Sequence, residues 1–266
     1  DGSGGDLSPA DQVVAEIKAM GGEAVSNGDD ISSWEGSQRL INTAVETFGD
    51  INIVVNNAGI LRDRMLTNMT EEEWDAVIKV HLKGTFGPSR WAAAYWREQA
   101  KAGKPTMGRI INTTSVSGIY GNIGQTNYGA AKAGIASFTV IAALELARFN
   151  VTVNAVAPVA LTRMTEGLGN APETDEEREM RSPRWIAPIV TWLASDEAAH
   201  VTGRVFEASG QTLAIAEGWH RGPSVAPIDD PNKIGAAVAE MLKQARPNAG
   251  MDGKDGSWPQ NTIGKK

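Results

Sequence analysis

The residues of this chain best suited to acid–base chemistry are Tyr128 and Lys132, four positions apart in a segment rich in small residues. If the segment is helical, this spacing places both side chains on one face, with the ammonium near the phenol. A free phenol has a pKa of about 10, and a neighbouring cation lowers it by stabilising the phenolate. The pair therefore predicts a tyrosine that carries a proton with the help of Lys132. An ordinary pair at the boundary of the core is the alternative, since short motifs arise easily by chance.

Two further polar segments follow predicted strands, at the sheet edge where ligands bind in open parallel sheets. Ser115 stands thirteen residues before Tyr128, just after a predicted strand at residues 109–113. Its hydroxyl can bind a carbonyl oxygen while the tyrosine moves the proton. Residues 56–59 (Asn-Asn-Ala-Gly) follow a predicted strand at residues 51–55, and small residues there allow a flat ring to approach the backbone. Simple turns are the alternative for both segments.

The elements that must position these groups alternate along the chain. Helices are predicted at residues 8–20, 33–48, 71–99, 125–149, 184–194 and 231–244, and strands at residues 23–26, 51–55, 109–113, 151–156 and 204–208. Apolar strands without polar alternation, separated by helices, are typical of a parallel sheet covered on both faces. We therefore predict an α/β fold with a doubly wound parallel sheet in a single domain.

Composition excludes several classes of protein. The 266 residues are 41% hydrophobic and 21% charged, as in ordinary folded domains. The net charge of -7, without a basic stretch, argues against a nucleic-acid partner. The lack of cysteine and the presence of only three scattered histidines argue against a metal site. No apolar run approaches the length of a membrane span and no signal-peptide pattern is present, so we expect a cytoplasmic protein without a membrane partner.

Together, the Asn-Asn-Ala-Gly segment, the serine and the Tyr-x-x-x-Lys motif resemble the short-chain dehydrogenase/reductase family. The resemblance covers about residues 8–210 and implies a Rossmann-like fold, a nicotinamide cofactor and a homodimer or homotetramer. It implies catalytic roles for Ser115, Tyr128 and Lys132. Residues 59–65, 81–84 and 117–125 look more closely like the (3R)-hydroxyacyl-CoA dehydrogenase part of peroxisomal multifunctional enzyme type 2 and its bacterial relatives.

The resemblance also implies roles for residues that the motifs alone do not identify. His81 occupies the place of a family asparagine whose backbone carbonyl serves the site, and the closer subgroup has histidine there. A histidine satisfied by its neighbours on a helix face is the alternative. The implied cofactor-binding residues are Asp29, Asp30, Asn57, Ala58, Gly59, Tyr128, Lys132 and Pro158. Of the two aspartates, Asp30 is the better placed to contact adenine.

The implied activity is hydride transfer between NAD and the C3 hydroxyl or ketone of a 3-hydroxyacyl thioester, a small-molecule substrate. Two alternatives stay open: an NADPH-dependent 3-oxoacyl-carrier-protein reductase, and an inactive shortened family member that retains only subunit contacts. NADP is not excluded, because the deciding residue would lie at the end of a strand that the sequence does not contain.

The family's opening strand, Gly-rich turn and second strand have no counterpart in the sequence. We therefore expect an amino-terminally shortened core at residues 1–217 that lacks its first two strands and itself binds the cofactor weakly or not at all. Residues 162–183 are predicted to form an insertion or lid. Residues 218–266 are predicted to form an extension with one helix and a mobile tail.

Overall fold

The fold is taken from a computed structural model, which describes residues 8–162 and 171–257. The chain divides into two compact units, residues 1–216 and residues 217–266, and each is described by itself. The predicted loop at residues 1–7 lies outside the described residues, as does part of the predicted lid.

The first unit is built on a five-stranded sheet in the order β1-β2-β3-β4-β5. The strands are β1 (Ile53–Asn56), β2 (Gly108–Thr113), β3 (Val151–Pro158), β4 (Val205–Ala208) and β5 (Leu213–Ala216). The first four strands run parallel, and β5 pairs antiparallel with β4. The predicted α/β class with a largely parallel sheet is confirmed.

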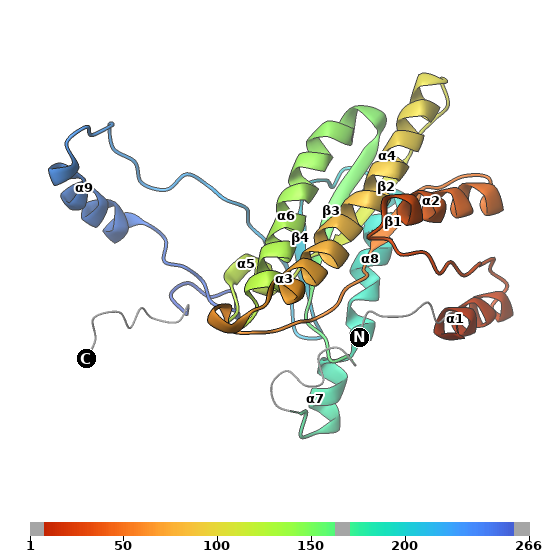
Figure 1. The fold of residues 1–266 in the computed structure, drawn as a ribbon, viewed down its shortest axis with the longest axis horizontal. Coiled ribbons are helices and arrows are strands. Elements are labelled where there is room, and N and C mark those ends of the chain that lie inside the picture. Colours follow the sequence, from red (N-terminus) through yellow and green to blue (C-terminus); the bar gives the residue numbers. More distant parts are fainter. Residues whose placement is uncertain (1–7, 163–170, 258–266) are drawn as a thin grey trace. The chain divides into compact units, whose positions relative to one another are not determined.

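Helices cover both faces of this sheet (Figure 1). The helices of this unit are α1 (Ser8–Ala19), α2 (Trp34–Phe48), α3 (Glu71–Ile78), α4 (Gly84–Lys101), α5 (Val116–Tyr120), α6 (Thr126–Leu146), α7 (Asp175–Met180) and α8 (Ala187–Ala194). One core joins α2, α4 and α6 to β1, β2 and β3, and a second joins α8 to the opposite face of β2, β3 and β4. The carboxyl ends of β1, β2 and β3 therefore emerge at one edge, between two packed layers.

The ends of α2 follow the signals in its sequence. Ser33 caps the helix by accepting a hydrogen bond from the Gly36 N–H, and Gly49 ends it in the left-handed region at φ 84°. Buried Ile41 then joins the core shared with β1. These caps fix where the chain enters β1, and so where residues 56–59 leave it.

The predicted strand at residues 23–26 was wrong, because the structure describes no strand between residues 8 and 52. A parallel strand needs a hydrogen-bonding neighbour, and these residues do not pair with β1. β1 is an edge strand of the described sheet, with Ile53 and Val55 45% and 48% exposed. Residues 23–26 form a segment without strand pairing.

The long helix predicted at residues 71–99 is present but changes its winding midway. Between α3 and α4, residues Lys79–Lys83 form a π-helical turn, which widens the helix where His81 turns inward. Such turns occur often at functional sites. The prediction also missed β5, α5 and α7, all short elements of six residues or fewer.

The second unit contains one helix, α9 (Pro231–Gln244), at the residues predicted for it. Asp230 caps this helix through the Asn232 N–H, and Pro231 occupies its first position. Beyond the helix, Arg246 forms ion pairs with Glu217 and Asp255.

Candidate active site

Helix α6 carries Tyr128 and Lys132 on the face that packs toward β2 and α5. Lys132 is 3% exposed, and its ammonium donates a 2.6 Å hydrogen bond to the Thr113 carbonyl at the end of β2. The Thr114 hydroxyl donates to the Lys132 carbonyl at 2.6 Å. The end of β2 therefore holds both the backbone and the side chain of this lysine.

Ser115 lies between β2 and α5 and acts as the N-cap of that short helix. Its hydroxyl accepts a 3.1 Å hydrogen bond from the Ser117 N–H. The Ser115 side chain also lies close enough to the Tyr128 phenol to lower the pKa of that phenol. Gly118 makes this approach possible, since a Cβ there would lie 2.6 Å from the Ala133 backbone nitrogen of α6. The structure thus brings Ser115, Tyr128 and Lys132 into one site.

Burial dominates the electrostatics of the phenol and the ammonium. Burial raises the pKa of Tyr128 above its ordinary value, Ser115 partly opposes this, and the negative charge of Asp63 adds to the rise. Burial also lowers the pKa of Lys132 to about 7. The lysine nitrogen lies 5.6 Å from the centre of the Tyr128 ring. In this arrangement the phenol is protonated at neutral pH, and lowering of its pKa by Lys132 stays a prediction.

His81 fills the space between the end of β1 and Tyr128. It is 2% exposed, and its Nε2 lies 3.0 Å from the Ile60 nitrogen and 2.7 Å from the Ile60 oxygen. Its ring meets the Tyr128 ring edge-on, with the ring centres 5.1 Å apart. A Cβ on Gly59 would approach the His81 Cε1 to 2.4 Å, so glycine is required where this ring packs.

Burial, with a smaller contribution from the charge of Lys132, lowers the pKa of His81 to about 4. The imidazole is therefore neutral at physiological pH and can pack beside the phenol without adding a charge. Its Nδ1 is buried without a hydrogen-bonding partner among the described residues.

The segment after β1 reaches the same edge of the sheet. Asn57 and Ala58 are exposed, and the Asn57 side-chain oxygen Oδ1 accepts a 3.1 Å hydrogen bond from the Thr113 hydroxyl. Pro158 ends β3 and pairs with Ala208 of β4. The predicted residues Asn57, Ala58, Gly59 and Pro158 therefore lie at the carboxyl ends of the parallel strands, as their positions in the sequence indicate.

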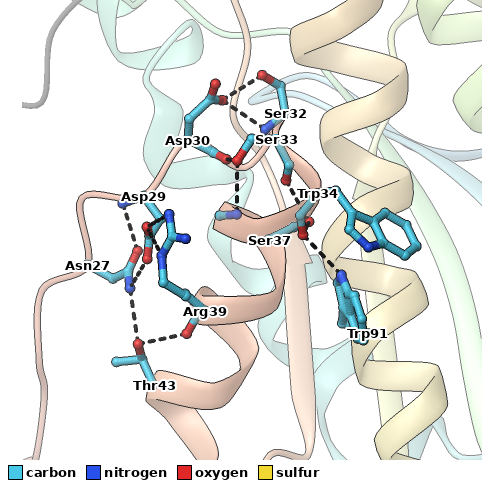
Figure 2. A network of polar contacts seen from close by, with 11 residues as sticks. Asn27, Asp29, Asp30, Ser32, Ser33, Trp34, Ser37, Arg39, Thr43 and Trp91 are labelled. Atoms are coloured by element: carbon cyan, nitrogen blue, oxygen red, sulfur yellow. Dashed lines mark hydrogen bonds and ion pairs between the residues drawn. The ribbon is translucent and has the colours of Figure 1, made fainter.

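Asp29 and Asp30 belong to a polar network before α2 (Figure 2). Asp29 binds Arg39 through one carboxylate oxygen at 2.7 Å and Asn27 through the other at 3.0 Å, and these bonds lower its pKa. Asp30 accepts hydrogen bonds from the Ser32 hydroxyl and N–H, which also lower its pKa.

The two aspartates differ in how much of the side chain is exposed to solvent. The side chain of Asp29 is only 18% exposed, whereas that of Asp30 is 59% exposed, with its second oxygen 3.9 Å from the Lys79 nitrogen. Asp30 is therefore the one with an accessible oxygen.

Motif analysis missed the residues that fix the start of α6. Asn127, fully buried just before Tyr128, donates to the Arg62 carbonyl at 2.9 Å and to the Glu73 carbonyl at 3.1 Å. Its own oxygen accepts from the Tyr128 N–H at 2.7 Å. The Arg64 N–H donates to the Gly124 carbonyl at 2.8 Å. An asparagine beside the tyrosine was visible in the sequence, but its burial was not.

A family model described as short chain dehydrogenase matches residues 4–173, more than half of the chain. The chain belongs to the short-chain dehydrogenase family. The predicted family and its oxidoreductase class are therefore confirmed. Members of this family use NAD(P), and the match does not distinguish between the two cofactors.

The proteins that this chain is similar to include a hydroxyacyl-CoA dehydrogenase and a peroxisomal multifunctional protein. The hydroxyacyl-CoA dehydrogenase ChsB1 of Mycobacterium tuberculosis is 40% identical over 252 residues, which are 92% of this chain and 79% of that protein. The peroxisomal hydratase-dehydrogenase-epimerase of Neurospora crassa is 41% identical over 243 residues, 91% of this chain. The chain spans only 26% of the length of that fungal protein. The predicted closer likeness to hydroxyacyl-CoA dehydrogenases is confirmed.

A solved structure supports the short-chain dehydrogenase fold. The crystal structure of a short chain dehydrogenase from Mycobacterium avium superposes with a TM-score of 0.82 at 49% sequence identity. It covers 91% of this chain, and the match covers 80% of that structure. The predicted Rossmann-like arrangement is confirmed.

The residues at the strand ends fit a nicotinamide nucleotide. A buried lysine ammonium, a phenol and a serine hydroxyl converge beside exposed Asn57 and Ala58, where a flat ring and a ribose could lie against small side chains. Asp30 offers an accessible carboxylate oxygen in the turn before α2. The strand–turn–helix that cradles a dinucleotide pyrophosphate is not found among residues 8–52.

Proposed function

We propose that the site on this chain serves hydride transfer between NAD and the C3 position of a 3-hydroxyacyl thioester, in the presence of the pyrophosphate-binding segment that residues 8–52 lack. The observation that carries the proposal is the convergence of Ser115, Tyr128 and Lys132 at the carboxyl edge of the sheet. The name of the hydroxyacyl-CoA dehydrogenase ChsB1 supports the substrate class. The choice of NAD over NADP rests on the same likeness.

Tyr128 is the proposed proton carrier. In the oxidation, the C3 hydroxyl gives its proton to the tyrosine oxygen, the C–H bond breaks with its electron pair, and a C=O bond forms. A bound nicotinamide supplies the acceptor for the hydride. Ser115 holds the substrate oxygen through its hydroxyl, which lies near the phenol. In the reverse direction the protonated phenol gives its proton to the alkoxide.

The protonation state seen in the structure suits ketone reduction directly, because burial keeps the Tyr128 phenol protonated. Oxidation requires the phenolate, which needs a cation nearby. Lys132 is the proposed cation: its side chain lies one helical turn from the phenol, and breaking its bond to the Thr113 carbonyl would free the ammonium. We propose that the same ammonium binds the nicotinamide ribose.

We further propose a homodimer or homotetramer that forms through α4 and α6. Apolar side chains on these helices are exposed: Phe86 by 42%, Ile141 by 52% and Leu144 by 78%. The segment Thr126–Phe149 is long and apolar enough to cross a membrane by length and composition alone. It carries Tyr128 and Lys132 and packs on β3. We propose that the exposed outer side of this helix forms the subunit interface. We also propose that the protein is cytoplasmic.

Replacing Tyr128 by phenylalanine tests the proposal. Formation of NADH from 3-hydroxybutyryl-CoA should fall by a factor of about 100 to 10,000, because the proton carrier is gone. Cofactor affinity should stay nearly unchanged. The matched control is Tyr95→Phe, which removes a hydroxyl bonded to Asp50 outside the site.

Two outcomes would contradict parts of the proposal. Full turnover by the Tyr128→Phe variant would refute the assignment of the proton carrier. Faster turnover of a 3-oxoacyl carrier-protein thioester with NADPH than of the CoA substrate with NAD would favour the reductase alternative.

A further inference from the structure

A chain of buried polar side chains lies behind the site, between the sheet and the helices. The Asn56 side-chain amide donates to the Ser89 hydroxyl at 2.9 Å and to the Asn112 side-chain oxygen Oδ1 at 2.8 Å. The Asn112 amide donates to the Thr139 hydroxyl at 2.9 Å, and that hydroxyl donates to the Ile135 carbonyl at 2.8 Å. Asn112 and Thr139 are fully buried. The donors of this chain therefore have acceptors, and at Asn112 and Thr139 these bonds are fully buried.

The Asn112–Thr139 bond is one of two side-chain bonds that join the same face of α6 to β2. Thr139 follows Lys132 by seven residues, so the two side chains project from one helix face two turns apart. Lys132 reaches the Thr113 carbonyl, and Thr139 accepts from the neighbouring Asn112. The long lysine and the short threonine converge on adjacent strand residues. Sliding of α6 along the strand would break the short Thr139 bond first.

Asn112 also fixes the position of Thr113, the next residue of β2, which contacts both Asn57 and Lys132. It stands opposite Asn56 in the β1–β2 register, and the two amides are hydrogen-bonded to each other. The next residue, Thr113, binds Asn57 through its hydroxyl and the Lys132 ammonium through its carbonyl. A slip of one residue would turn the buried amide to the other sheet face, so this pair specifies the register.

We propose that the Asn112–Thr139 hydrogen bond sets the position of α6 along β2 and thereby places Lys132 and Tyr128 opposite Ser115. Both are positioning residues, because they act through the helix and the strand and touch no reacting atom. Only the expected change in kcat rests on the proposed function. The placement of Lys132 is a property of the protein without substrate.

A graded series at Thr139 tests the inference. Serine keeps the hydroxyl, cysteine fills the space with a weaker acceptor, and valine keeps the shape but leaves the Asn112 amide unpaired. The control is Ser137→Ala, at an exposed position of the same helix. We expect kcat to fall in the order threonine, serine, cysteine, valine, with a loss of about tenfold for valine. The pH at which kcat is half-maximal should shift in the valine variant. A loss of stability alone would not cause this shift.

A second measurement needs no activity. Lys132 should react slowly with an amine-acylating reagent, followed by peptide mass spectrometry, because its nitrogen is buried. The valine variant should react about tenfold faster at Lys132, whereas the serine variant should match the wild type. Exposed Lys104 serves as the internal reference.

The two readouts separate the possible failures. Unchanged Lys132 labelling and an unchanged pH profile in folded cysteine or valine variants would overturn the inference. A wild type without turnover but with the predicted labelling pattern would overturn the proposed function and leave the placement of α6 supported.

Discussion

Replacing Lys132 by methionine should stabilise the unliganded chain at acidic pH, and this advantage should shrink as the pH rises. The ammonium is 3% exposed, and burial lowers its pKa to about 7 from the ordinary value of 10.5. Methionine keeps most of the length of the side chain and carries no charge. The variant therefore removes the titration while filling similar space.

The sign follows from the protons bound by each state. Below pH 7, Lys132 is charged in both the folded and the unfolded chain, so the full penalty of burying the ammonium falls on the folded state. Between pH 7 and 10.5 the folded chain has released the proton and the unfolded chain still holds it, so the stability of the wild type rises with pH.

The size of the effect follows from the same two pKa values. Their separation corresponds to about 5 kcal/mol at about 1.4 kcal/mol for each tenfold change. About 2 kcal/mol of that falls between pH 7, where the folded chain has released half of the proton, and pH 9, a range that most proteins tolerate. The lost hydrogen bond to the Thr113 carbonyl adds an offset that does not depend on pH.

Urea unfolding followed by tryptophan fluorescence measures the effect. The free energy of unfolding of the Lys132→Met variant minus that of the wild type should fall by about 2 kcal/mol from about pH 7 to about pH 9. Exposed Lys104, replaced by methionine, is the control and should show no such trend. Parallel pH profiles for the wild type and the Lys132→Met variant would show that the ammonium keeps an ordinary pKa, and would refute its burial.

Three further substitutions test the packing around the site. Gly59→Ala should lower turnover and cofactor affinity together, because its Cβ would lie 2.4 Å from the His81 ring. The double variant Gly59→Ala with His81→Ala should recover part of the loss. If it recovers nothing, another contact causes the loss. Thr70→Ala removes the capping box with Glu73 and should lower the free energy of unfolding by about 1 kcal/mol in urea titrations, with kcat unchanged. Gly118→Ala should reduce kcat, since its Cβ would push α5 and its N-cap Ser115 away from α6. A variant with a lower melting temperature and an unchanged kcat would contradict this.

The sequence was sufficient for elements with long periodic patterns or strong end signals. The helices at Trp34–Phe48 and Pro231–Gln244 begin and end within a residue of the prediction, because Ser33, Gly49 and Pro231 mark their ends. It was insufficient where a strand depends on a neighbour. Residues 23–26 have no ladder partner, and the short β5 exists because β4 offers it an edge.

The three catalytic candidates could be located from their order along the chain, since parallel strands bring their carboxyl ends together. The buried polar residues behind them could not. Asn112 stands in a polar run, residues 112–117, that resembles a turn, yet it lies inside β2 with no exposed surface. A single sequence does not show that an asparagine is buried when the partners that satisfy it, here Asn56 and Thr139, come from elements far apart in the chain.

The electrostatics of the pair on α6 show why spacing alone is an incomplete guide to chemistry. Four residues on a helix place Lys132 within reach of Tyr128, but a flexible lysine goes to the best acceptor that it can reach. In the structure that acceptor is the Thr113 carbonyl, and burial moves the pKa of the ammonium down and that of the phenol up. Both shifts favour the neutral forms. The site is thus set to donate a proton, and a phenolate requires the lysine to exchange its carbonyl partner for the tyrosine oxygen.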